Sequence, residues 1–252
     1  MGKISRRKLI TTGLAATAGA SGIAVAASLA RRYGLIPPDG AGIYGPGETL
    51  TYAAHRLLTR NSMAREFPRS EISPLPFANE VERLSDEFKR LQDGKFADWK
   101  VAVNGMVSHP GFISLADIKA FPRSSQITLI ACEEGWSYVA EWIGTPLSHI
   151  LNMVGILPQA RYVVYRSIQS NWWDSIDLAD AFHPQTFMTY GMNGKDLPVA
   201  FGGPLRMRVP RQLGYKNVKY ITSLTVTDNL KQFGKGLGSS SPEEGYSWYA
   251  GM

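Results

Sequence analysis

One segment combines a clear strand pattern with the single cysteine of the chain: Ile127-Thr128-Leu129-Ile130-Ala131-Cys132-Glu133-Glu134-Gly135-Trp136-Ser137. Its first five residues form an apolar run that predicts a strand, and Gly135 predicts a turn. Cys132 therefore stands at the carboxyl end of a strand, where an irregular loop begins, and such loops commonly carry functional residues. A lone cysteine is more often an inert buried side chain than a ligand, so this stretch alone leaves both interpretations open.

Short runs of the same kind occur on both sides of it, each bounded by Gly, Pro or Asn. The predicted strands cover residues 99–105, 127–131, 162–165, 205–209 and 221–226. Apolar residues at helical spacing predict helices over 79–92, 114–121 and 146–154, with Ser114 as an N-cap. Strands outnumber helices and do not alternate regularly with them, which favours an α+β fold of mixed sheets with short helices.

The composition is that of a globular protein. The 252 residues are 44% hydrophobic, enough to bury a sizeable core in one large or two small domains. We predict an N-terminal targeting segment at 1–32, a loop-rich extension with one helix at 33–94, a core domain at 95–232 and a tail at 233–252. The extension is predicted to be rich in loops because Gly and Pro are dense over residues 33–76.

The net charge of +6 comes largely from the N-terminus. The first 32 residues contain no acidic residue but six basic ones, namely Lys3, Arg6, Arg7, Lys8, Arg31 and Arg32. The remaining chain is close to neutral with interspersed charges, so nucleic acid is not expected as a partner. The single cysteine excludes an intramolecular disulfide.

Ser5-Arg6-Arg7-Lys8 is followed by an uncharged run over residues 9–30. A paired arginine ahead of a weakly hydrophobic run is typical of a twin-arginine export signal, which predicts a periplasmic protein. The run is also long enough to span a bilayer, but its Gly and Ser residues make it only mildly apolar, which favours export. Cleavage at 25–27 or 28–30 and retention as a membrane anchor both stay open.

Several common sites are not indicated. The four histidines, His55, His109, His149 and His183, are far apart and lack the usual zinc spacings. His149 is interpreted as structural, and His183 as a satisfied loop histidine or a site residue. The chain has no Gly-x-Ser-x-Gly or Walker motif.

A cluster of basic residues lies near the C-terminus, beside Gly202-Gly203 and Gly214: Arg206, Arg208, Arg211, Lys216 and Lys219. Backbone N–H groups and cationic side chains of this kind bind phosphate. The alternative is a solvated strand face.

Several motifs, in order along the chain, resemble the sulfite-oxidase family of molybdopterin enzymes, and most of all its branch of periplasmic protein-methionine-sulfoxide reductase catalytic subunits. They are Cys132-Glu133-Glu134-Gly135-Trp136-Ser137, Trp142-Ile143-Gly144-Thr145-Pro146-Leu147, His183-Pro184-Gln185-Thr186-Phe187-Met188-Thr189-Tyr190-Gly191, Asn193-Gly194-Lys195-Asp196-Leu197-Pro198, Gly202-Gly203-Pro204-Leu205-Arg206 and Gly214-Tyr215-Lys216-Asn217-Val218-Lys219. The resemblance implies that residues 95–232 form a molybdopterin-binding catalytic domain.

The resemblance also implies site residues. Cys132 would hold the molybdenum of one molybdopterin cofactor per chain, and a soft thiolate suits such a metal. The other implied cofactor contacts are Ser167 through its hydroxyl, Arg206, Asn217, Val218 and Lys219 at the pterin phosphate, and Arg60, Asn61 and Ser62, where Ser62 replaces a histidine of the family. Phe201 stands where the family has His or Asn.

The departures bear on the substrate. Glu133 and Glu134 replace the Gly-Asn and the arginine that sulfite oxidases use, and two carboxylates would repel sulfite. Oxygen-atom transfer with reduction of a small or protein-bound sulfoxide- or N-oxide-like substrate is therefore expected, with electrons from a membrane haem or quinol partner. The alternatives are a sulfite dehydrogenase and an exported binding protein without metal. Arg161 or Arg166 could still supply a cation, and Trp136, Trp172 and Trp173 either line a pocket or belong to the core.

Overall fold

The computed structural model describes residues 28, 30, 34–40, 45–79, 84–169 and 172–252. The paired arginines of the predicted export signal and its cleavage site at 25–27 lie outside these residues. Among the helices that the structure describes, none is long and apolar enough to cross a membrane.

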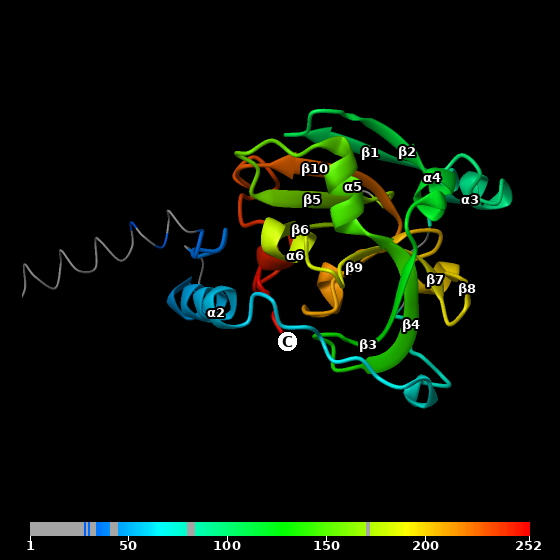
Figure 1. Ribbon diagram of the computed structural model, residues 1–252, viewed down its shortest axis with the longest axis horizontal. Coiled ribbons are helices and arrows are strands. Elements are labelled where there is room, and N and C mark those ends of the chain that lie inside the picture. Colours follow the sequence, from blue (N-terminus) through cyan, green and yellow to red (C-terminus); the bar gives the residue numbers. More distant parts are fainter. Residues whose placement is uncertain (1–27, 29, 31–33, 41–44, 80–83, 170–171) are drawn as a thin grey trace, which may run out of the picture.

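Two five-stranded sheets form the body of the molecule (Figure 1). The first has the order β2 (Gly111–Ser114), β1 (Lys100–Gly105), β10 (Ile221–Thr227), β5 (Tyr162–Ser167), β6 (Trp173–Asp177). The second has the order β3 (Ser124–Ala131), β4 (Ser137–Pro146), β7 (Phe187–Met192), β8 (Lys195–Asp196), with β9 (Arg206–Arg208) also paired to β7. Only the β1–β10 pairing is parallel among these pairings. The predicted α+β class with mixed sheets is confirmed.

Helices and 3₁₀ turns precede, connect and follow the strands. They are α2 (Gly45–Leu58), η1 (Arg69–Glu71), α3 (Asp86–Asp93), α4 (Leu115–Ala120), α5 (Leu147–Val154), α6 (Leu178–Ala181), η2 (Val199–Phe201), η3 (Gly214–Lys216) and α7 (Ser240–Glu243). The predicted cap of α4 is confirmed, since Ser114 and Asp117 form a reciprocal capping box. The predicted helix at 146–154 is α5, and it ends at Gly155 with φ of 65°.

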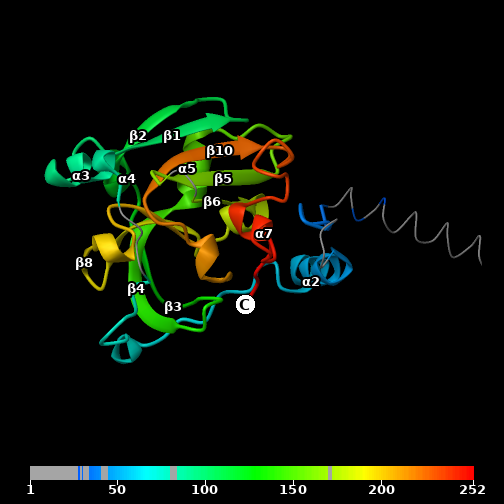
Figure 2. The same cartoon turned by 180° about the vertical axis from the view of Figure 1, so that it is seen from behind.

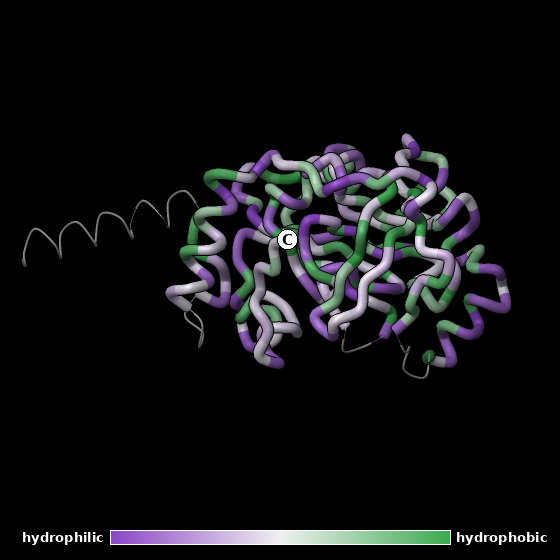
Figure 3. The backbone as a smooth tube through the Cα atoms, turned by 90° about the horizontal axis from the view of Figure 1, so that it is seen from below, coloured by the Kyte–Doolittle hydropathy of each residue, from purple (hydrophilic) through white to green (hydrophobic). Residues whose placement is uncertain are grey.

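The main core lies between the two sheets and receives side chains from both. Trp99 on its edge is fully buried, and its indole N–H donates to the Ile221 carbonyl. Phe88 of α3 packs edge-on against Trp99 and Tyr220. In the hydropathy-coloured backbone, hydrophobic segments run along the strands in the middle of the molecule, and hydrophilic segments lie in many of the outer turns (Figure 3).

All five predicted strands are present, but the sequence analysis missed others, among them β4, the longest. β4 was missed because Gly144 and Pro146 suggest loop punctuation, and because burial on both faces removes the alternation of polar and apolar residues. The start of the predicted helix 79–92 was wrong: the helix begins at Asp86, where the Ser85 hydroxyl accepts from the Phe88 N–H, and residues 80–83 lie outside the described part.

The N-terminal extension contains a helix that was not predicted. α2 occupies Gly45–Leu58 within the stretch that we expected to be loops. The Gly-Pro-Gly at its first turn suggested a loop, although Pro is well tolerated in the first turn of a helix. The tail also packs on the body, since Trp248 and Tyr249 are buried and contact Tyr52 of α2.

Candidate functional site

A cavity opens at the carboxyl end of β3, with a volume of about 700 Å³ when the space at its mouth is included. Its walls come from the loop after β3, the end of β5, and the segment from η3 to the start of β10. The lining residues are Asn79, Cys132, Glu133, Glu134, Trp136, Ser167, Gln169, Trp172, Arg206, Gly214, Tyr215, Asn217, Val218, Lys219 and Tyr220. Segments far apart in sequence thus meet around the one cysteine of the chain.

The loop after β3 holds Cys132 at this cavity. The Cys132 N–H donates to the Trp136 carbonyl, and the Gly135 N–H donates back to the Cys132 carbonyl. Gly135 has φ of 94°, which a glycine adopts readily. The tight loop fixes the direction of the thiol and places both following carboxylates beside it.

The thiol faces acidic groups. Its Sγ lies 3.1 Å from Glu133 Oε2 and 3.8 Å from Glu134 Oε2. Burial, together with the hydrogen bond to Glu133 and the carboxylate charges, raises the pKa of Cys132 to about 12. The free side chain is therefore a protonated thiol at neutral pH, and it requires a cation such as a metal ion to become a thiolate ligand.

Another wall of the cavity carries basic side chains, Arg206 and Lys219. The Arg206 guanidinium donates to the carbonyls of Phe201 and Asn217, and Lys219 Nζ lies 2.7 Å from the Ala200 carbonyl. Neither cation forms an ion pair with a carboxylate in the described part of the chain. Arg206 Nε is buried without a hydrogen-bond partner among the described residues. Burial lowers the pKa of Arg206, and burial together with Arg206 lowers that of Lys219 to about 7.

Arg206 is buried and Lys219 is half-buried. A cation away from water without a counter-charge is costly, and an anionic ligand removes that cost. On the same side of the cavity, Gly214 packs directly against the cysteine loop. A Cβ added to Gly214 would lie 3.3 Å from the Cys132 Cα and 3.4 Å from its Cβ. The donor set is therefore a soft sulfur beside an anion-binding wall, and it fits an anionic ligand that carries a thiophilic metal.

The predicted site residues fall into two groups. The first group lines the cavity: Ser167, Arg206, Asn217, Val218 and Lys219. The side-chain oxygen of Asn217 accepts hydrogen bonds from the Arg208 guanidinium and the Val209 N–H, and these contacts hold this wall of the cavity in place. Arg60, Asn61 and Ser62 are not brought to this cavity, because they follow α2 on a different face. The cofactor contact of these three residues stays a prediction.

The basic cluster near the C-terminus is split between the cavity and the interior. Arg208 is buried and donates to Thr128 and Asn217, and Lys216 is fully buried against Asp174 at 2.6 Å. Arg211 donates to the carbonyls of Thr59 and Arg60. The interpretation of this cluster as a solvated strand face is therefore wrong. Of its five basic residues, only Arg206 and Lys219 line the cavity.

Of the remaining candidate residues, some line the cavity and others lie elsewhere in the protein. Trp136 and Trp172 line the cavity, whereas Trp173 is a buried core residue. His183 is buried, with its ring nitrogens within hydrogen-bonding distance of the Ser62 carbonyl and the Gln185 N–H, so it is satisfied structurally. Arg161 and Arg166 do not line the cavity. The described residues contain no group of three His, Cys, Asp or Glu side chains placed to hold a metal.

Sequence reasoning missed Asn79, Gln169, Tyr215 and Tyr220, which also line the cavity. Tyr220 has a positive φ of 59° and lies one residue before β10. Their positions follow from how β5, η3 and β10 converge, which no local motif indicates. Two aromatic side chains pack against the cavity-lining Trp136: the ring centroids of Phe77 and Trp136 are 5.3 Å apart, and Tyr138 stacks on Trp136.

Comparisons with known proteins show the family of the chain. The family model described as the oxidoreductase molybdopterin binding domain matches residues 89–233. Over 196 residues the chain is 35% identical to YedZ1 of Azospira oryzae, a subunit assigned to a protein-methionine-sulfoxide reductase, with 77% of this chain and 70% of that one covered. It is 31% identical to MsrP of Xanthomonas campestris, a protein-methionine-sulfoxide reductase catalytic subunit, over 59% of this chain and 51% of that one. The match thus spans about half the length of that catalytic subunit.

The fold is similar to that of the sulfane dehydrogenase SoxCD from Paracoccus pantotrophus. The TM-score is 0.51 with 22% identity, and the match covers 53% of this chain and 39% of that one. This likeness concerns the fold, which is of the sulfite-oxidase type. By its domain and its relatives, the chain belongs to the family of oxidoreductases with a molybdopterin binding domain and is an enzyme.

Proposed function

We propose that this chain is an exported, periplasmic catalytic subunit that reduces sulfoxide groups, with protein-bound methionine sulfoxide as the substrate class. The observation that carries the proposal is the position of Cys132 in a cavity with carboxylates and aromatic rings at one side and unpaired cations at the other. The relatives MsrP and YedZ1 support the substrate class, and the paired arginines support export.

In this assignment Cys132 would hold the molybdenum of one molybdopterin per chain, Arg206, Asn217, Val218 and Lys219 would hold its phosphate, and Ser167 would contact it from the cavity wall. The bound cofactor supplies two-electron oxygen-atom transfer. Glu133 Oε2, which accepts the hydrogen bond of the thiol, is placed to take the proton that the thiol loses when its sulfur becomes a ligand. The catalytic domain is assigned to residues 95–232, and the match over 89–233 supports this boundary.

The chain's own residues favour a neutral substrate over an anion. Glu134 is held in place because the Trp136 indole N–H donates to its Oε2 at 2.7 Å, so its negative charge stays at the mouth. A sulfoxide is neutral and accepts hydrogen bonds, whereas sulfite carries negative charge that these carboxylates repel. Trp136 and Trp172 line the cavity and provide apolar surface for a thioether side chain, and Phe77 packs against Trp136.

The electron donor is proposed to be a separate membrane protein with haem or a quinol site, and the name of the relative YedZ1, a subunit of a protein-methionine-sulfoxide reductase, supports a second subunit. The test is turnover by the exported protein isolated from cells that make the cofactor. A reduced viologen dye is oxidised when methionine sulfoxide or an oxidised protein is added, and sulfite reduces no ferricyanide. Rapid oxidation of sulfite with no turnover of sulfoxides would contradict the assignment.

A further inference from the structure

α2 has an inverted distribution of polar and apolar residues. Its charged residues and its histidine, Glu48, His55 and Arg56, are buried or half-buried, whereas its exposed residues carry no charge. The exposed residues are Pro46, Gly47, Leu50, Thr51, Ala54, Leu57 and Leu58. The exposed fractions of Leu50, Leu57 and Leu58 are 72%, 68% and 81%. A helix on the surface of a soluble protein normally has the opposite pattern.

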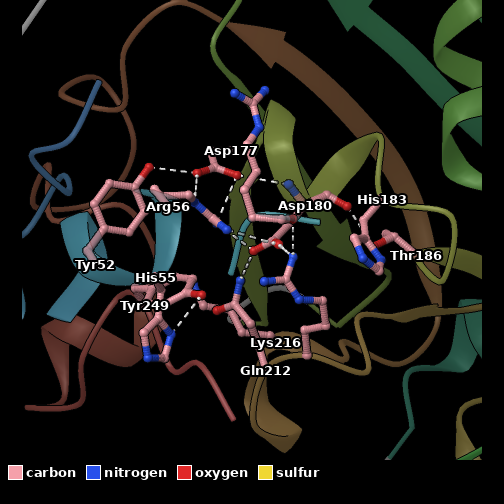
Figure 4. Close-up of polar contacts among 12 residues, drawn as sticks. Tyr52, His55, Arg56, Asp177, Asp180, His183, Thr186, Gln212, Lys216 and Tyr249 are labelled. Atoms are coloured by element: carbon pink, nitrogen blue, oxygen red, sulfur yellow. Dashed lines mark hydrogen bonds and ion pairs between the residues drawn. The ribbon is translucent and has the colours of Figure 1, made fainter. Parts of the chain in front are cut away.

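The inner face of α2 is fixed on the body (Figure 4). The Arg56 guanidinium forms buried ion pairs with Asp177 and Asp180, each at 2.7 Å. The Tyr52 hydroxyl donates to Asp177 at 2.6 Å. Tyr52 also packs edge-on against Tyr249 of the C-terminal segment. The leucines of the outer face are therefore held outward by specific buried contacts and do not result from a frayed helix.

Unpaired cations lie beside the exposed leucines. Arg60 and Arg161 are exposed, and neither forms an ion pair with a residue that the structure describes. Together with Leu57 they line a hollow of about 1070 Å³, counted with its open mouth, between α2 and the start of β5. An apolar helix face flanked by arginines is the arrangement by which interfacial helices bind anionic lipid surfaces.

The segment that precedes α2 in the sequence also favours a position of this helix close to a membrane. Residues 9–30 contain no charged residue, and 14 residues (31–44) separate this run from Gly45 at the start of α2. Those residues span at most about 50 Å when fully extended. α2 therefore stays close to any membrane that receives the run during export. In Figures 1 and 2, α2 stands at one end of the molecule, apart from both sheets.

We propose that α2, through Leu50, Leu57 and Leu58, docks the enzyme on the surface of a lipid bilayer, with Arg60 and Arg161 contacting anionic headgroups. A bilayer fits better than a protein partner because the large exposed side chains of this face are all leucines, whereas protein interfaces are rich in aromatic side chains. The helix lies in the plane of the interface and inserts its leucines among the acyl chains. This surface is separate from the Cys132 cavity, so the proposal does not depend on the substrate assigned above.

The test is flotation of the exported protein with vesicles of phosphatidylcholine mixed with phosphatidylglycerol. The variant Leu50→Gln/Leu57→Gln/Leu58→Gln is expected to partition at least about tenfold more weakly, because three exposed leucines no longer enter the acyl region. The matched control Leu75→Gln/Phe112→Gln changes residues that are 91% and 74% exposed on other parts of the surface, and it is expected to bind like the wild type. Arg60→Gln and Arg161→Gln are each expected to weaken binding about fivefold, and only with the anionic lipid.

A second measurement separates α2 from the upstream run. A photoreactive phospholipid is crosslinked to the vesicle-bound protein, and the adducts are mapped by peptide mass spectrometry. Adducts on residues 45–60 that disappear in the triple variant support the proposal, whether or not the run at 9–30 is also labelled. Equal flotation of the triple variant with no adducts on α2 would overturn it. A dimer in lipid-free solution that the triple variant abolishes would overturn it in favour of a second copy of the chain.

Discussion

Gly214 packs against Cys132 so closely that a Cβ on residue 214 would lie 3.4 Å from the cysteine Cβ. Arg206 and Lys219 line the same cavity as Gly214 and Cys132. The contact between Gly214 and Cys132 therefore fixes the position of the sulfur relative to the basic wall.

We expect Gly214→Val to displace the Cys132 loop, since the added methyl groups would extend beyond a Cβ that already has close neighbours. The molybdenum content of the purified protein should fall several-fold, and circular dichroism should show a retained fold. Gly111→Val is the control, because a Cβ there meets nothing within 4 Å. Equal metal content in the two variants would show that the contact does not position the sulfur.

The charge of Lys219 should make the stability of the cofactor-free protein depend on pH. Burial and Arg206 lower its pKa from 10.5 to about 7, so between these values the unfolded chain binds a proton that the folded, cofactor-free chain does not. This group therefore makes the cofactor-free fold more stable as the pH rises from 7 to 10.5, and it disfavours the fold at lower pH.

An anion in the cavity favours the protonated amine. Calorimetry with sulfate, which does not itself titrate in this range, should show affinity falling above pH 7 by up to about tenfold per pH unit. Lys219→Gln should bind sulfate more weakly at pH 6 and lose this dependence on pH. A flat profile in the wild type would contradict the placement of Lys219 at the anion site.

Glu133 and Glu134 should control the charge of the substrate. Two unit charges 4 Å apart near a protein surface interact by about 4 kcal/mol, so removal of one charge should change selectivity by at least about tenfold. We expect Glu134→Gln to raise kcat/KM for sulfoxides that carry a negative charge relative to neutral sulfoxides. Glu66→Gln, outside the cavity, is the control. A selectivity that is the same in Glu134→Gln and the wild type would mean that this carboxylate does not face the substrate.

The buried ion network of α2 should dominate local stability. Arg56→Met leaves Asp177 and Asp180 buried without their main cation, so the free energy of unfolding should fall by about 3–5 kcal/mol. Lys89→Gln removes an exposed pair with Asp86 and should cost less than about 1 kcal/mol. Urea denaturation measures both. A loss below 1 kcal/mol in Arg56→Met would show that α2 is not anchored by this network.

Much of the fold could be predicted where local patterns are strong. The run before Cys132 and the Ser114 cap were identified because strand propensity and capping chemistry are local. β4 and α2 were missed for a physical reason. β4 is buried on both faces, and α2 presents its leucines outward, so neither has the periodicity that sequence reasoning relies on.

The site was predicted in part through ordered motifs. Cys132, Ser167, Arg206 and Lys219 line one cavity, although up to 87 residues separate them in sequence. Asn79 was missed because its place depends on how the N-terminal extension crosses the body. The partners of Arg208 and Lys216 could not be foreseen either, because buried ion pairs and hydrogen bonds between distant strands leave no local pattern.

The most direct test of the central claim is elemental analysis of the exported protein, isolated from cells that make the cofactor, beside Cys132→Ser prepared in the same way. Cys132 as the metal ligand predicts about one molybdenum per chain in the wild type, and a lost metal or an altered electron paramagnetic resonance signal in the variant. A wild type without molybdenum, or a variant with the same metal content, signal and activity as the wild type, would contradict it.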